Sequence, residues 1–219
     1  MKLYPVMLNI NGRQTVVIGG GEVAARKISD LLDSGAMVKV ISPDFNREIL
    51  KLNEQYGERL VLLKKVYEKN DLSGAVLVFS AADDSQVNAA VFTEAEEKGI
   101  LINAVDDPPN CSFYVPSFVR KGDLLFSLST GGASPAMAAR LRREMEKHIP
   151  SGIDLILEKL KQARTVLKED KFFSGISSSL RGSILKHIVN DDRLLEELSS
   201  CGDDELIEFL DRVKSSCIS

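Results

Sequence analysis

The stretch "VVIGGGEVAARK", Val16 to Lys27, joins a short apolar run to a helical pattern through three consecutive glycines. Gly19, Gly21 and Ala24 fit the spacing G-x-G-x-x-G/A at a strand-to-helix junction. In that context the first glycine permits a tight turn, the second lets the backbone approach a pyrophosphate, and the small third residue lets helix and strand pack closely. A helix N-terminus adds free N–H groups for the phosphates. The stretch therefore predicts a dinucleotide-binding turn, and the alternative is a glycine turn that merely saves space.

Short apolar runs alternate with helical patterns from residue 1 to about residue 115. The candidate strands are "TVVIG", "MVKVIS", "LVLLKK", "AVLVFSA" and "GILINAV". Apolar spacing predicts one helix between the first two strands and another between the last two, ending at Gly35 and Gly99. Near-continuous apolar strands that alternate with helices are typical of a parallel, doubly wound sheet. We therefore expect an α/β fold with a Rossmann-type NAD-binding domain over residues 1–113.

Beyond this domain the sequence pattern changes twice. "CSFYVPSFVRKGDLLFSLST" predicts two strands joined by a tight turn at residues 120–123. "GGASPAMAARLRREMEKHI" predicts a helix with Ser134 as N-cap and Pro135 at the first helical position. We expect a small α+β segment over residues 114–150 and an all-helical domain over residues 151–219. That tail is too small for an independent catalytic domain, and a lid, a dimer arm or a cap over a substrate are all compatible with it.

The composition of the 219-residue chain excludes several classes of protein. A formal net charge of −4 gives no sign of a nucleic-acid binder. No apolar stretch approaches the ~20 residues that span a bilayer, and Pro5 and Asn9 interrupt the N-terminal apolar run, which argues against a signal peptide. Three cysteines without a CxxC pair argue against both a disulfide framework and a zinc site. We expect a cytoplasmic protein with no membrane contact and no resident metal.

Few residues are available for acid–base chemistry. The two histidines, His148 and His187, both lie in the C-terminal third, and no tyrosine has a lysine four residues further on. "INAVDDPPN" follows the fifth expected strand and therefore lies at the sheet edge where ligands bind in open α/β sheets. Asp106 or Asp107 is the best available acid–base group. The alternative is a solvated loop carboxylate.

Two further stretches are expected at the same edge of the sheet. The second strand ends in "VISPDF", where Asp44 could accept hydrogen bonds from the adenine ribose. Because no arginine follows before Arg47, the sequence favours NAD over NADP. "SAADDSQVN" closes the fourth strand, and the small residues Ala81 and Ala82 would allow close approach to the cofactor. At least one of the two aspartates that follow is expected at a helix N-terminus.

A second glycine turn lies in "STGGASPAMAARLR". It places the hydroxyls of Thr130 and Ser134 around Gly131 and Gly132, ahead of a helix N-terminus, which suits an anion. Residues 116–150 carry six basic and three acidic side chains, a balance that suits a polycarboxylate or a phosphate. The alternatives are a well-capped helix after a flexible turn and a solvated helix face.

Taken in order, "VVIGGGEVAARK", "AADDSQVN", "INAVDDP", "SFYVPS" and "LSTGGASPAMAARLR" resemble the precorrin-2 dehydrogenase/sirohydrochlorin ferrochelatase family, which includes the N-terminal half of bacterial siroheme synthase. The resemblance covers residues 2–150, and the helical tail only by length and type. It implies NAD-dependent oxidation of precorrin-2 to sirohydrochlorin and, in some members, insertion of Fe²⁺ as a substrate. It also implies an intertwined homodimer, with residues 112–150 as the dimerisation region. In a chain of this length we expect no methyltransferase domain.

The resemblance also implies individual site residues. The aspartate of the family's N-x-V-D run falls on Asp106 rather than Asp107, and it could serve both reactions because each removes protons. Thr130 stands where the family often has serine. Cofactor-binding positions are expected at Gly19, Gly21, Glu22, Val23, Pro43, Asp44, Ala81 and Ala82. Substrate-binding positions are expected at Asn103, Ser112, Thr130, Gly131, Gly132 and Ser134.

A rival hypothesis from another class is a non-catalytic NAD-binding module, such as a redox sensor or a regulatory domain. Such a module needs neither a base nor a second anion site. "NAVDD" and "STGGASP" therefore favour the enzyme.

Overall fold

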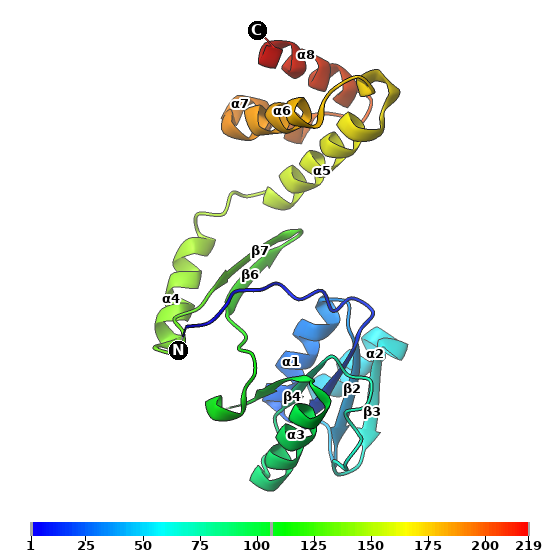
Figure 1. The fold of residues 1–219 in the computed structure, drawn as a ribbon, viewed down its shortest axis with the longest axis vertical. Helices are drawn as coiled ribbons and strands as arrows, with labels where there is room; N and C mark the ends of the chain where they lie inside the picture. Colours follow the sequence, from blue (N-terminus) through cyan, green and yellow to red (C-terminus); the bar gives the residue numbers. More distant parts are fainter. Residues whose placement is uncertain (1, 106, 219) are drawn as a thin grey trace. The chain divides into compact units, whose positions relative to one another are not determined.

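The computed structural model describes residues 2–105 and 107–218. The chain divides into an N-terminal unit, Leu3–Val115, and a C-terminal unit that begins at Pro116 (Figure 1). The parallel sheet lies within the N-terminal unit, whereas the hairpin and the helical tail lie within the C-terminal unit.

Five parallel strands form the sheet of the N-terminal unit, in the order β3-β2-β1-β4-β5. The strands are β1 (Gln14–Ile18), β2 (Met37–Ser42), β3 (Leu60–Lys64), β4 (Leu77–Ser80) and β5 (Leu101–Ala104). The parallel Rossmann-type sheet predicted from the apolar runs is thus confirmed. Because the strand order reverses beside β1, the carboxyl edge between β1 and β4 is the switch point at which open α/β sheets bind ligands.

Helices cover both faces of this sheet (Figure 1). They are α1 (Glu22–Asp33), α2 (Arg47–Tyr56) and α3 (Ser85–Lys98), with a short 3₁₀ helix at Gly57–Arg59 and another at Pro108–Asn110. Alternation along β1 explains the two layers, because successive side chains of a strand point to opposite faces. Val17 packs in the core that contains α1, whereas Val16 and Ile18 pack in the core that contains α3.

The ends of the two predicted helices follow their local signals. Gly35 follows the C-cap Ser34 of α1, and Gly99 is the C-cap of α3. Their φ values of +85° and +64° are left-handed, a conformation that suits glycine. Asp84 caps α3, because its carboxylate accepts a hydrogen bond of 2.8 Å from the backbone N–H of Gln86. The expected helix-terminal aspartate is therefore Asp84.

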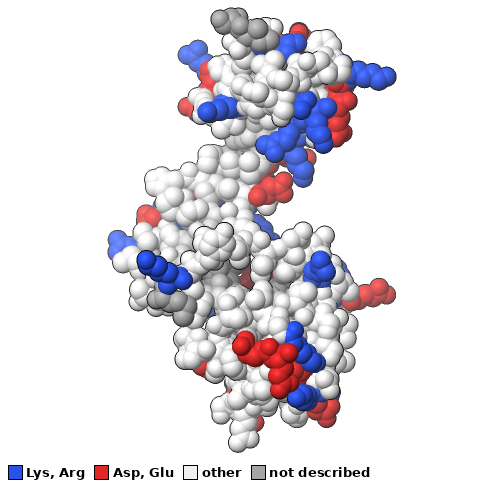
Figure 2. Space-filling view, in the orientation of Figure 1, with Lys and Arg blue, Asp and Glu red and all other residues white. Residues whose placement is uncertain are grey.

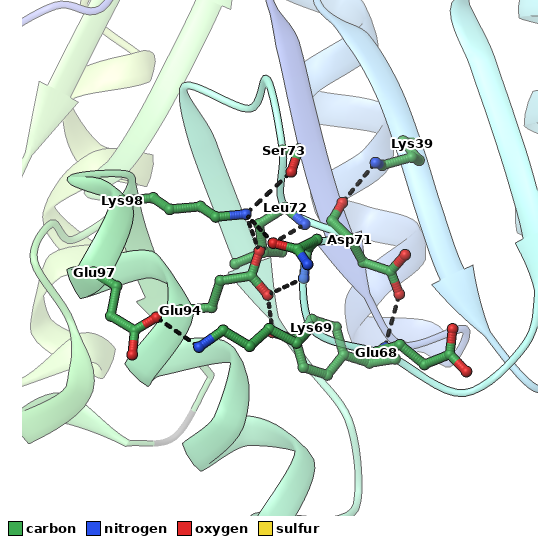
Figure 3. A network of polar contacts seen from close by, with 11 residues as sticks. Lys39, Glu68, Lys69, Asp71, Leu72, Ser73, Glu94, Glu97 and Lys98 are labelled. Carbon is green, nitrogen blue, oxygen red and sulfur yellow. Dashed lines mark hydrogen bonds and ion pairs between the residues drawn. The ribbon is translucent and has the colours of Figure 1, made fainter.

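The connection from β3 to β4, residues 65–76, is described throughout and contains no helix, although parallel strands are usually joined through one. Glu94 on α3 accepts hydrogen bonds from the backbone of this connection (Figure 3). The carboxylate accepts hydrogen bonds from the N–H groups of Asn70, at 2.9 Å, and Leu72, at 3.3 Å. It also accepts one from the hydroxyl of Tyr67. One buried side chain thus fixes the path of an irregular segment.

Glu94 is ionised even though only 2% of the residue is exposed. Burial alone would raise its pKa, but hydrogen bonds from Lys98, Tyr67 and the Asn70 backbone outweigh burial and hold the pKa below its usual value. The Lys98 ammonium lies 2.7 Å from the carboxylate. Burial and the bond to Glu94 raise the pKa of Tyr67. The carboxylate is therefore paired and hydrogen-bonded, as a buried charge must be.

We expect Glu94→Gln to lower the free energy of unfolding of the N-terminal unit by about 2 kcal/mol, because an amide cannot accept every bond that the carboxylate accepts. The four tyrosines of the chain all lie within Leu3–Val115 and tryptophan is absent from the sequence, so urea denaturation followed by tyrosine fluorescence reports this unit. The matched control is Glu97→Gln, whose exposed ion pair with Lys69 should be worth less than about 1 kcal/mol.

The same variant predicts a pH dependence. The folded-state pKa of Glu94 is lowered, so its stabilisation is present above the unfolded-state pKa of about 4.3 and is lost as the pH falls through the folded-state pKa. The difference between wild type and Glu94→Gln should therefore shrink in acid. Equal stability of the two proteins at neutral pH would contradict the role of Glu94.

The C-terminal unit begins with the predicted hairpin and helix. Strands β6 (Ser117–Lys121) and β7 (Leu124–Leu128) pair antiparallel, and α4 (Pro135–Glu146) follows. The side chain of Ser134 accepts a hydrogen bond of 3.2 Å from the N–H of Met137, which confirms it as the N-cap. Both strands and the helix thus form where their local sequence signals predict them.

The remainder of the C-terminal unit is helical, as predicted. It comprises α5 (Ile153–Glu169), a 3₁₀ helix (Lys171–Phe173), α6 (Ser178–Asn190), α7 (Asp192–Ser200) and α8 (Leu206–Ile218). These helices enclose a core of their own that includes Phe173, Ile184 and Leu210. Over residues 2–105 and 107–218, no helix has both the length and the apolar character needed to cross a membrane.

Candidate functional site

A cavity of about 620 Å³ opens at the carboxyl edge of the sheet in the N-terminal unit, within the size range of small-molecule sites. The turns after β1, β2 and β4 line it, together with the start of the helix-free connection after β3. Among the predicted cofactor positions, the cavity brings together Gly19, Gly21, Pro43, Asp44, Ala81 and Ala82. Glu22 and Val23 follow the turn as the first residues of α1 and do not line the cavity.

Two of the three glycines hold the turn against the neighbouring strand ends. A Cβ on Gly19 would overlap the carbonyl oxygen of Ala81, and a Cβ on Gly20 would overlap that of Asp44. At Gly21, by contrast, an added Cβ would have no described atom beyond the adjoining backbone within 4 Å. Gly19 and Gly20 are therefore required by the fold, whereas Gly21 leaves open space where a ligand can approach. Sequence reasoning treated Gly20 only as part of the glycine turn and gave it no role of its own.

The first turn of α1 offers donors for an anion. Gly21 is the N-cap, and no described side chain caps the helix. The N–H of Ala25 is the first to bond within the helix, to the carbonyl of Gly21 at 3.0 Å, so the three preceding N–H groups lack an intrahelical acceptor. Free N–H groups and the positive end of the helix dipole favour phosphate. The turn and helix together fit the pyrophosphate of a dinucleotide.

The end of β2 carries the candidate ribose-binding acid. Asp44 lines the cavity, is 88% exposed, and pairs with Lys64 at the end of β3, with Oδ1 and Nζ 2.9 Å apart. Sequence reasoning missed Lys64 because the two residues meet only through the alignment of neighbouring strands. Of the residues that line the cavity, Val66 and Tyr67 come from the connection held by Glu94, and were also missed.

The turn after β4 is fixed by Asn88 on α3. Its side-chain oxygen accepts hydrogen bonds from the hydroxyl of Ser80, at 2.6 Å, and from the N–H of Ala82, at 3.3 Å. Its side-chain amide donates to the carbonyl of Ala82 at 2.8 Å. The N–H of Ala81 in turn donates to the carbonyl of Ile18, at the end of β1, at 2.8 Å. Asn88 thus holds Ala82 at the cavity wall beside Ala81, a role that the motif alone did not reveal.

Lys27 is a half-buried cation on α1 that sequence reasoning did not single out. Burial lowers its pKa, against the opposing effect of Asp30. Its ammonium lies 5.5 Å from the centre of the Phe79 ring on β4, and that ring contacts Phe113 edge to face. The helix that begins at the glycine turn therefore also carries a positive charge beside β4.

The predicted substrate residues Asn103 and Ser112 make structural contacts after β5. The Asn103 amide donates to the carbonyl of Phe113 at 3.0 Å, and the Ser112 hydroxyl accepts from the N–H of Ile102 at 2.8 Å. Both side chains hold residues 111–113 beside the strand. Their assignment to a substrate stays a prediction.

The predicted base, Asp106, lies outside the described residues. The N–H of Val105 donates to the carbonyl of Ser80 at 2.9 Å, and the N–H of Asp107 donates to the carbonyl of Ala104 at 3.3 Å. The Asp107 carboxylate accepts a hydrogen bond of 2.7 Å from the Asn110 side chain. Asp107 therefore has a local structural partner in the turn that follows β5.

The second glycine turn lies in the C-terminal unit. Thr130 Oγ1 donates to the carbonyl of Ser134 at 3.1 Å and accepts from its N–H at 3.2 Å. Gly131 and Gly132 have φ values of +62° and +86°. These contacts are those of a well-capped helix after a tight turn, and the predicted anion site at these residues stays a prediction. Among residues 2–105 and 107–218, no cluster of three or more His, Cys, Asp or Glu side chains could hold a metal ion.

Two family models match the chain. A model described as putative NAD(P)-binding matches residues 6–117, and a model described as the central part of sirohaem biosynthesis proteins matches residues 127–148. The first covers the sheet and its cavity, and the second covers the end of β7, the glycine turn and α4.

Several curated proteins that are similar to this chain carry the name siroheme synthase. That of Methylobacillus flagellatus is 38% identical over 175 residues, which are 80% of this chain and 37% of the relative. That of Nitrosospira multiformis is 42% identical over 152 residues, which are 68% of this chain and 32% of the relative. The chain thus spans about a third of the length of these relatives.

A solved structure named SirC, precorrin-2 dehydrogenase, has the same fold. It superposes with a TM-score of 0.74 at 24% sequence identity, covering 97% of this chain and all of the other. This likeness confirms the predicted fold, in which a Rossmann-type sheet is followed by a small α+β segment and a helical tail.

Proposed function

Because this chain belongs to the family of siroheme-biosynthesis proteins with an NAD(P)-binding domain, we propose that it oxidises precorrin-2 to sirohydrochlorin with NAD⁺. The observation that carries the proposal is the cavity at the switch point of the sheet, where Gly19–Gly21 and the first N–H groups of α1, which lack an intrahelical acceptor, fit a pyrophosphate. The ordered motifs and the relatives named siroheme synthase support the same reaction class.

The reaction takes a hydride and a proton from the tetrapyrrole, so that precorrin-2 and NAD⁺ give sirohydrochlorin, NADH and H⁺. When bound, NAD⁺ supplies the hydride acceptor. The glycine turn holds its pyrophosphate, and Asp44 accepts hydrogen bonds from its ribose, which favours NAD over NADP. We assign proton removal to Asp106, because a single carboxylate suffices as base and the family's aspartate falls on this position.

The substrate side of the proposal rests on charge. Precorrin-2 carries several carboxylates, and residues 116–150 have an excess of basic side chains. The Thr130–Ser134 turn leads into the N-terminus of α4, where the positive end of the helix dipole favours a carboxylate. We keep Asn103, Ser112, Thr130, Gly131, Gly132 and Ser134 as the proposed substrate positions.

An anaerobic spectroscopic assay with enzymatically made precorrin-2 and NAD⁺ tests the reaction. Formation of NADH in step with sirohydrochlorin is the expected result. A protein that binds NADH but forms none from precorrin-2 would instead be the non-catalytic NAD-binding module. Metal insertion is tested as a second activity of the same site by adding Fe²⁺ or Co²⁺ to sirohydrochlorin with and without protein. The rate without protein gives the spontaneous rate of insertion.

We also propose that the protein is a homodimer, formed through residues 112–150. Met137, Leu141 and Met145 are all exposed and recur every four residues along one face of α4. The surface over the adjacent hairpin is largely uncharged on the face that Figure 2 shows. Light scattering should give twice the mass of one chain, and Leu141→Lys should shift it toward one. A wild-type monomer at micromolar concentration would contradict the dimer.

The proposal includes two further points of organisation. Residues 1–113, 114–150 and 151–219 act as cofactor, dimerisation and helical domains, and limited proteolysis should cut near the two boundaries. The protein works in the cytoplasm, and cell fractionation tests that location.

A further inference from the structure

We propose that Lys64 weakens the discrimination between NAD⁺ and NADP⁺ by neutralising Asp44 at the ribose end of the cavity. The inference rests on the proposed dinucleotide site. It concerns one atom group that distinguishes the two cofactors, the 2′-phosphate of the adenine ribose.

The register of the sheet brings the two charges together. Lys64 on β3 is aligned with Ser42 on β2, and Asp44 follows Ser42 by two residues. Its Nζ lies 2.9 Å from Oδ1 of Asp44, which lines the cavity. The side chains of Lys64 and Asp44 are 72% and 88% exposed, so either can turn toward a ligand at little cost. The charge at this end of the cavity is therefore that of a pair, not of a lone acid.

An acid at this position normally selects NAD for two reasons. Its carboxylate accepts hydrogen bonds from the ribose hydroxyls, and its negative charge repels a 2′-phosphate. The ion pair leaves the first effect in place, because a carboxylate has about four acceptor positions and Lys64 occupies one of them. It cancels much of the second, because a cation lies within 3 Å of the repelling oxygen. Asp44 can bind a ribose and still tolerate a phosphate beside it.

Other cations near the strand end have different surroundings. Lys65 lies 2.7 Å from Glu68 and 3.1 Å from Asp71, on the connection after β3. Arg47 begins α2 and does not line the cavity. Lys64 is therefore the cation that the ion pair places beside Asp44.

Binding of NADH and NADPH, followed by nicotinamide fluorescence, tests the inference without turnover. The two ligands differ only by the 2′-phosphate. Lys64→Met should weaken NADPH binding roughly tenfold at low salt and change NADH binding less than about twofold. Asp44→Asn should strengthen NADPH relative to NADH by a similar factor. The matched control is Lys69→Met, which removes an equally charged side chain, 69% exposed, from its pair with Glu97 and should leave the ratio unchanged.

The outcomes separate this inference from the proposed function. An NADPH-to-NADH affinity ratio that is the same in wild type and Lys64→Met would overturn the role of Lys64 while leaving dinucleotide binding intact. Failure of the wild-type chain to bind either dinucleotide would remove the proposed cofactor and this inference with it. High salt should reduce the effect of Lys64→Met, because exposed charges are screened.

Discussion

Gly21→Ala is expected to weaken NADH binding by about 10–100-fold while the N-terminal unit keeps its stability. The added Cβ meets no described atom within 4 Å beyond the adjoining backbone, and φ of −83° at this position suits any residue. The cost therefore arises only when a pyrophosphate approaches the backbone at the start of α1. A lost hydrogen bond to a charged group is worth roughly 1.5–3 kcal/mol, and each 1.4 kcal/mol is tenfold in affinity.

The neighbouring glycines provide the contrast. A Cβ on Gly20 would overlap the carbonyl oxygen of Asp44 and lie 2.8 Å from Oγ of Ser42, so Gly20→Ala must push the turn away from the end of β2. Gly19→Ala would likewise overlap the Ala81 carbonyl, in a backbone conformation with φ of +119°. Both variants should lose stability as well as binding.

The measurement pairs NADH fluorescence titration with urea denaturation followed by tyrosine fluorescence. The informative result is a variant that folds as well as wild type and binds poorly. If Gly21→Ala binds NADH as tightly as wild type, the backbone at this glycine does not approach the phosphates, and the cofactor must lie elsewhere along the edge. The same loss of stability in Gly21→Ala and Gly20→Ala would contradict the open space at Gly21.

Much of the fold was predictable because its signals are local. The apolar runs, the glycines that end α1 and α3, and the Ser134–Pro135 start of α4 each act within a few residues, and each appears where the sequence places it. The dinucleotide-binding prediction and the family resemblance are confirmed by the two family models, because both depend on motifs that are continuous in the chain.

What the sequence did not reveal depends on partners far apart in the chain. The connection after β3 contains no helix, and several of its donors bond to Glu94, which lies 22 residues after Leu72 and 27 after Tyr67. Gly20 is constrained by the carbonyl of Asp44, which lies in the turn after the neighbouring strand β2. Lys64 reaches Asp44 only because β2 and β3 are adjacent. Spacing within one motif carries no information about these contacts.

Replacing Asp106, the proposed base, is the second change for which we expect a large effect, in this case on turnover. Asp106→Asn should lower kcat for precorrin-2 oxidation by about 10²–10⁴-fold, the usual contribution of a positioned general base. NADH affinity should stay within about threefold of wild type, because the proposed cofactor contacts lie on the glycine turn and at the ends of β2 and β4. Stopped-flow or steady-state formation of NADH measures the first quantity, and fluorescence titration measures the second.

Asp107→Asn is the matched control, because it makes the same change one residue further on. The Asp107 carboxylate already accepts a bond from Asn110, and an amide keeps an oxygen for that bond, so its loss of charge should change kcat less than about tenfold. The pair of variants separates chemistry from position in the chain. A large loss in Asp107→Asn with near-normal turnover in Asp106→Asn would move the base to Asp107. Near-normal turnover in both would mean that neither carboxylate removes the proton, and that the acid–base group comes from outside the "NAVDD" turn.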